Sequence, residues 1–186
     1  VCRGEASVSR PTYAVVLVDY QAGDLVLSAL RSVADEMGAT PWEGVVVDNA
    51  ASDAVAQTPA YPSGVRVIRN AVNVGFGTAV NQGIAATSAP FVIVMNPDCR
   101  LDAGAVGAMR AELEAHPTCA LVGPRILDPD GSAQGSARGD PDMLTGIFGR
   151  TGLLRRVLPW LPVSQRNVPV AEDLAAGPSA VVDWVS

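Results

Sequence analysis

Apolar runs rich in valine and isoleucine alternate along this chain with segments of helical spacing. The runs predict buried strands, and the segments between them predict helices. The predicted strands are 13–18, 44–47, 65–68, 91–95 and 120–122, and the predicted helices are 24–37, 78–87 and 104–115. Strands that alternate with helices in this way are typical of an α/β fold with a doubly wound, mainly parallel sheet.

The run at 91–95 is the starting point of this prediction, because all five of its residues are apolar. Such a run indicates a central strand that is covered on both faces. It ends at Asn96-Pro97-Asp98, so we expect Asp98 at the carboxyl end of that strand, where open α/β sheets bind ligands. A carboxylate there could hold a divalent cation that clamps a diphosphate. Alternatively, Asn96 and Asp98 cap the helix that follows.

Two further strands also end in aspartate, at Asp19 and Asp48. Right-handed crossovers place the carboxyl ends of parallel strands on one edge, so these aspartates are expected to converge with Asp98. Asp48 could accept the imide N–H of a uracil or thymine, or cap a short helix near Ser52. Tyr20 could stack on the same base, or simply pack against the fold.

The segment after the third predicted strand is rich in asparagine and glycine. Asn73 and Asn81 could reach a ribose or a diphosphate, and Gly75 and Gly77 would allow the backbone to approach a ligand closely. The alternative is a tight turn that leads into a helix. The segment does not predict dinucleotide binding, because that fingerprint follows the first strand and has a third glycine. Nucleotidyl transfer would need a basic phosphate loop, which the sequence lacks.

Composition narrows the chemistry further. The formal charge of the 186 residues is −6, and no basic stripe is present, which argues against a nucleic-acid partner. All 13 cationic residues are arginine, so lysine-based chemistry is excluded. His116 is the only histidine, which excludes a histidine metal cluster. No run approaches the roughly 18 apolar residues of a membrane span, and a cytoplasmic location is expected.

Taken together, several short motifs resemble those of the family 2 glycosyltransferases, and most closely their rhamnosyltransferase-like branch. Each motif is weak alone, but their order and spacing are specific, and the resemblance covers about residues 12–186. The motifs are Val18-Asp19-Tyr20, Val47-Asp48-Asn49-Ala50, Asn70-x-x-Asn73-x-Gly75-Phe76, Asn81-x-Gly83, Asn96-Pro97-Asp98, Gly123-Pro124-Arg125 and Val182-Asp183-Trp184-Val185-Ser186.

The resemblance implies a glycosyltransferase A-type fold that binds a UDP- or dTDP-linked sugar, with rhamnose as one candidate. It implies Mg²⁺ or Mn²⁺ on Asp98, and a glycan or lipid-linked acceptor in cell-wall or surface polysaccharide synthesis. Asn96 stands where the family often has an acid, and Asp19 stands where this branch usually has asparagine. The donor-binding residues that it implies are Asp19, Tyr20, Asp48, Asn73, Gly75, Phe76, Asn81 and Asn96.

Domain organisation is predicted from the same comparison with the family. Residues 1–12 are expected to form a disordered tail, 13–140 the donor-binding domain and 141–186 the start of an acceptor-side region. The general base of the family would follow Ser186, so the sequence predicts a donor half whose transfer activity is impaired by truncation. The alternative is a non-catalytic or vestigial nucleotide-sugar-binding fragment. Leucine and arginine are mixed at 141–162, which could touch the inner face of the cell membrane.

Overall fold

The computed structural model describes residues 10–50, 61–132, 137–138 and 184–185. These residues belong to two compact units, one reaching Gly107 and the other beginning at Ala108. The elements in chain order are β1 (Tyr13–Asp19), α1 (Asp24–Met37), β2 (Trp42–Asp48), β3 (Val65–Arg69), α2 (Phe76–Ala85), β4 (Phe91–Met95), α3 (Ala105–Ala115), β5 (Ala137–Arg138) and β6 (Trp184–Val185).

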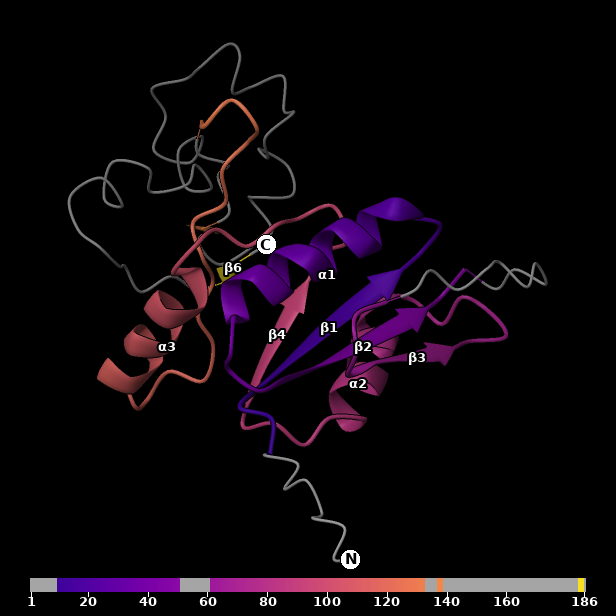
Figure 1. Ribbon diagram of the computed structural model, residues 1–186, viewed down its shortest axis with the longest axis horizontal. Helices are drawn as coiled ribbons and strands as arrows, with labels where there is room; N and C mark the ends of the chain where they lie inside the picture. Colours follow the sequence, from indigo (N-terminus) through magenta and orange to yellow (C-terminus); the bar gives the residue numbers. More distant parts are fainter. Residues whose placement is uncertain (1–9, 51–60, 133–136, 139–183, 186) are drawn as a thin grey trace, which may run out of the picture. The chain divides into compact units, whose positions relative to one another are not determined.

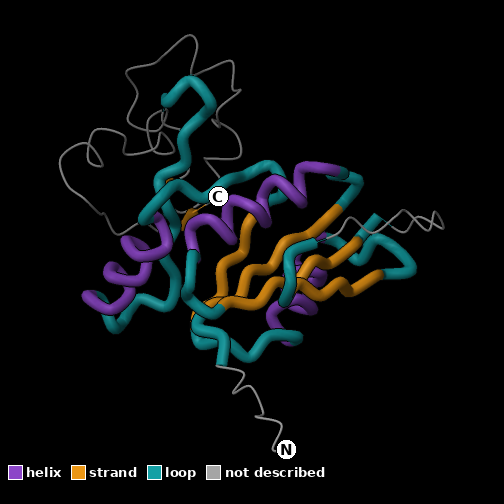
Figure 2. The backbone as a smooth tube through the Cα atoms, in the orientation of Figure 1, coloured by secondary structure: helices purple, strands orange, loops and turns teal. Residues whose placement is uncertain are grey.

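The first unit is built on a four-stranded sheet in the order β3-β2-β1-β4 (Figure 2). Its neighbouring strands all pair in parallel. Helix α1 lies on one face of the sheet and α2 on the other (Figure 1), as right-handed crossovers in opposite directions require. This arrangement confirms the predicted α/β fold with a doubly wound, mainly parallel sheet. Among the described residues, no helix is both long enough and apolar enough to cross a membrane.

Two predictions about strands were wrong. In the described sheet β4 is an edge strand, whereas β1 is central and buried from Tyr13 to Val18. Val92 and Val94 of β4 are 36% and 46% exposed, because α2 packs on β1 and β2. The run at 120–122 does not form a strand, and Leu121 is 71% exposed. In the second unit, the described pairing is antiparallel, between β5 and β6.

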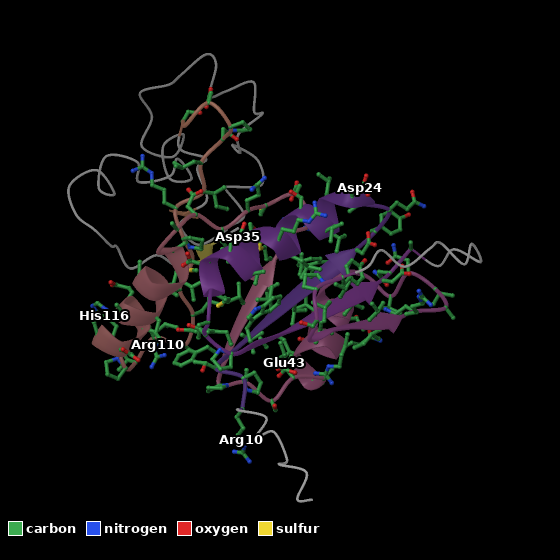
Figure 3. All side chains as sticks on the ribbon, viewed as in Figure 1. Arg10, Asp24, Asp35, Glu43, Arg110 and His116 are labelled. Atoms are coloured by element: carbon green, nitrogen blue, oxygen red, sulfur yellow. The ribbon has the colours of Figure 1, made fainter. Side chains whose placement is uncertain are left out.

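A polar clamp holds the amino edge of the sheet, at the opposite end from the start of α1. Figure 3 shows Glu43 at this edge and Asp24 at the other end. The Glu43 carboxylate accepts hydrogen bonds from the backbone N–H of Ser88 (2.9 Å) and from Arg66 Nη2 (2.7 Å). The same Arg66 nitrogen also donates to the carbonyl oxygen of Ala86. The clamp therefore joins β2 and β3 to the segment that connects α2 with β4.

Close packing of α2 on β1 depends on Gly83. A Cβ built on this buried glycine would collide with the side chain of Val16, and Val16 has no room to move because it is fully buried. We expect Gly83→Ala to lower the free energy of unfolding by about 1–3 kcal/mol, the usual cost of overpacking, less the gain in helix propensity. Urea denaturation measures this change. Gly77→Ala is the matched control, since its Cβ would meet nothing within 4 Å, and an equal loss there would contradict the packing argument.

Candidate active site at the carboxyl edge of the sheet

The carboxyl edge contains a pocket at the place where the strand order reverses. The chain runs from β1 outward to β2 and β3, then returns to the other side of β1 as β4. Ligands in open α/β sheets bind at such a switch point. The pocket has a volume of about 270 Å³. It is lined by Val18, Tyr20, Ala22, Leu25, Asn96, Pro97 and Asp98.

Asp98 presents an exposed carboxylate to this pocket. The loop turns at this point, with the backbone N–H of Cys99 donating to the carbonyl oxygen of Asn96 at 3.1 Å. The Cys99 thiol donates a weak hydrogen bond to Asp98 Oδ1 at 3.7 Å. Burial raises the pKa of Cys99, and the charge of Asp98 raises it further, so the group remains a neutral thiol donor.

The loop that carries Asp98 is held from α1. The buried hydroxyl of Ser32 accepts a hydrogen bond from the N–H of Leu101 at 3.1 Å. The carboxylate of Glu36 accepts from the N–H groups of Gly104 (2.8 Å) and Val106 (3.0 Å) at the start of α3. Glu36 therefore caps α3. Capping of this helix was the alternative role predicted for Asn96 and Asp98. The Asp98 carboxylate is left facing the pocket.

Asp19 and Asp48 are neighbours in the register of β1 and β2. Each carboxylate orders its own turn, because Asp19 accepts from the N–H of Ala22 (2.9 Å) and Asp48 from the N–H of Ala50 (3.1 Å). Arg69 Nε lies 3.9 Å from the other oxygen of Asp48. Neither aspartate lines the pocket, although both lie on the same edge. The alternative role of Asp48, as a cap near 52, falls outside the described residues.

Tyr61 is a member of this edge that the sequence did not suggest. Burial raises the pKa of its hydroxyl, the charges of Asp19 and Asp48 raise it further, and Arg69 opposes them. The phenol therefore lies within electrostatic reach of both aspartates and stays protonated, as a hydrogen-bond donor. It stands alone before Pro62 with no motif around it, so no sequence signal could have identified it.

The remaining candidates lie on and before α2. Asn73 precedes the helix, and its side-chain oxygen accepts the N–H of Gly75 at 2.9 Å. Gly75 has a φ of 84°, which favours glycine, and Phe76 begins the helix as an exposed ring. Asn81 is exposed on the next turn. The structure thus brings Tyr20, Asn96 and Asp98 together in the pocket. It places Asp19 and Asp48 at the neighbouring strand ends, Asn73 and Gly75 just before α2, and Phe76 at the start of α2.

A metal ion here would depend on few protein ligands. Within the described part of the chain, no three His, Cys, Asp or Glu side chains form a metal-binding group. Asp98 and Asn96 offer a carboxylate and an amide oxygen in one pocket. Mg²⁺ is commonly bound by one or two carboxylates and completed by substrate phosphates and water. The residues present therefore fit an ion that is shared with a diphosphate.

Fold and edge together define an α/β domain with a candidate ligand site at the switch point of its sheet. Residues 14–159 match the profile of glycosyl transferase family 2, and the chain belongs to that family. It is 34% identical, over 92% of its length, to N-acetylglucosaminyl-diphospho-decaprenol L-rhamnosyltransferase from two strains of Mycobacterium tuberculosis. The chain spans 58% of the length of these relatives. The resemblance to the rhamnosyltransferase-like branch is confirmed.

Among solved structures, the chain is similar to the crystal structure of S. aureus TarS 1–349. The TM-score is 0.47 and the sequence identity 17%. The similarity covers 69% of this chain and 41% of the other.

Proposed function

We propose that this chain binds the donor in a glycosyltransferase that moves a sugar from a UDP- or dTDP-linked donor to a glycan or lipid-linked acceptor. The observation that carries the proposal is the pocket at the β1–β4 switch point, lined by Tyr20, Asn96 and Asp98, in a member of this family. The name of the mycobacterial relatives, N-acetylglucosaminyl-diphospho-decaprenol L-rhamnosyltransferase, supports rhamnose as the sugar and a diphospho-lipid as the acceptor.

The nucleoside would be recognised at the ends of β1 and β2. The Tyr20 ring is 57% exposed beside the pocket, and base stacking would cover its apolar face. Asp48 is an acceptor when ionised, which suits the imide N–H of uracil or thymine and gives nothing to adenine at that position.

The diphosphate would be held on the opposite side of β1. Asp98, with the amide oxygen of Asn96, would hold Mg²⁺ or Mn²⁺. When bound, the ion would neutralise charge on the leaving diphosphate. The protein keeps Asp98 available for this role by capping α3 with Glu36 and by bracing the loop with Ser32. A cytoplasmic location and membrane contact through 141–162 stay predictions, and that segment lies outside the described residues, as does most of the predicted 141–186 region.

Calorimetric titration of the chain with UDP, dTDP and ADP, with Mn²⁺ or with a chelator, tests the proposal. We expect UDP or dTDP to bind at least about tenfold more tightly than ADP, a difference of about 1.4 kcal/mol, and to lose affinity in the chelator. Equal binding of ADP would contradict recognition of the base by Asp48. No binding of any nucleotide, by a chain that circular dichroism shows to be folded, would favour the alternative of a vestigial fragment.

A further inference from the structure

One face of α1 lies along the Asp98 loop, which is the segment 96–104 that joins β4 to α3. Leu25, Ser32 and Glu36 share this face, because seven and four residues of helix separate them. At the start of α1, Leu25 lines the candidate pocket together with Asp98. Further along α1, Ser32 and Glu36 line a second hollow together with later residues of the same loop. The helix therefore meets the loop at the pocket and again beyond it.

Asp98 lies between two points at which the chain is held. Before it, β4 ends at Met95, which is buried. After it, the N–H of Leu101 donates to the buried hydroxyl of Ser32 at 3.1 Å. The Asp98 carboxylate itself accepts a hydrogen bond from the Cys99 thiol at 3.7 Å, and a thiol is too weak a donor to fix its direction. The direction of the carboxylate therefore depends on where the loop is held.

Two side chains of α1 accept hydrogen bonds from the backbone of this segment. The Ser32 hydroxyl donates its proton to a carbonyl oxygen of α1 at 2.7 Å, which leaves its lone pairs for the N–H of Leu101. The two oxygens of Glu36 accept from different N–H groups, those of Gly104 and Val106. An amide in place of this carboxylate would turn a donor toward one of these N–H groups. Both side chains therefore hold the loop backbone, and neither lines the candidate pocket.

We propose that Ser32 and Glu36 are positioning residues, which fix Asp98 relative to Leu25 so that α1 supports both walls of the pocket. The inference deepens the proposed function and rests on it, because it concerns the metal-dependent part of donor binding. A cation that is shared with phosphates binds most tightly to a carboxylate already in place, since ordering a mobile ligand costs free energy. Residues that orient a metal ligand change the affinity for the metal without touching the ion. Ser32 and Glu36 act on Asp98 in this way, through the loop.

The test uses Ser32→Ala and Glu36→Gln, which remove acceptors and add no bulk. Glu36 is partly exposed, so its variant does not depend on core packing as Ser32→Ala does. The measurement is NMR titration with UDP, once with Mg²⁺, which does not broaden the spectra, and once with a chelator. We expect the Kd for UDP with Mg²⁺ to rise about three- to tenfold in each variant, while the Kd in the chelator changes less than about twofold. Hydrogen exchange at the N–H of Leu101 should become faster in Ser32→Ala, which reports the lost contact directly.

Asp35→Asn is the matched control for the lost charge. Asp35 is an exposed acid next to Glu36 on α1 (Figure 3) and takes no part in the hydrogen bonds to the loop, so both Kd values should match those of the wild type. An unchanged Kd with Mg²⁺ in both Ser32→Ala and Glu36→Gln would overturn this inference and leave the proposed function standing. An equal rise with Mg²⁺ and in the chelator would indicate a general effect on the fold and would also overturn it. A wild-type chain that binds neither UDP nor dTDP would overturn the proposed function and this inference with it.

Discussion

Asp98→Asn is expected to remove the Mn²⁺-dependent part of donor binding and to leave the fold intact. Asp98 is the carboxylate that lines the pocket, and a neutral amide is a poor replacement for it as a ligand of a hard cation. Losing a residue that merely supports a metal ligand costs about 10- to 100-fold, so losing the ligand should cost at least about 100-fold in UDP affinity with Mn²⁺. Stability should be unaffected, because the side chain is exposed and its described partner is the weak thiol donor of Cys99.

The measurement is calorimetric titration of UDP with Mn²⁺ and with a chelator, for the wild type and the variant. In Asp98→Asn the two conditions should give the same weak affinity. Asp102→Asn is the control, since Asp102 is an exposed acid of the same loop that does not line the pocket. If Asp98→Asn kept its dependence on Mn²⁺, or if Asp102→Asn lost it, the ion would have to be placed elsewhere.

The sequence predicted where the strands and helices lie along the chain better than it predicted which strands are adjacent in the sheet. Valine-rich runs and helical spacing located β1 to β4 and α1 to α3, because these patterns reflect local burial. The position of β4 at the edge of the described sheet could not be predicted in this way. A fully apolar run indicates a buried strand, but which strands flank it depends on the whole topology. Leu121 shows the same limit, since it is exposed and its apolar run forms no strand.

Site residues that come directly after a predicted strand could be predicted from the sequence. Residues whose role depends on contacts with distant parts of the chain could not. Asp19, Asp48 and Asp98 could be placed on one edge because parallel strands end together. Glu36 could not be assigned to α3, because 68 residues separate it from Gly104, which it caps. Asn49 could not be paired with Asn73, 24 residues away, since single amides leave no periodic pattern.

Asn49→Leu is expected to be the most destabilising change at the carboxyl edge. Asn49 is buried, and its side-chain oxygen accepts from the N–H of Val74 and from Asn70, while its nitrogen donates to Asn73. Leucine has a similar size but removes the acceptor of the Val74 N–H and one hydrogen bond each from Asn70 and Asn73. An unpaired buried group costs about 1–3 kcal/mol, and water reaches part of this half-buried loop, so we expect a loss of about 2–4 kcal/mol.

Urea denaturation of Asn49→Leu measures that loss, and Asn81→Ala provides the control. Asn81 is also an asparagine of the Asn-rich segment, but it is exposed on α2 and takes no part in the hydrogen bonds of Asn49, so its replacement should change stability by less than about 0.5 kcal/mol. If Asn49→Leu were as stable as the wild type, the loop before α2 would have to be held by other contacts. The stability of this one variant therefore tests whether the hydrogen bonds of Asn49 hold the loop before α2.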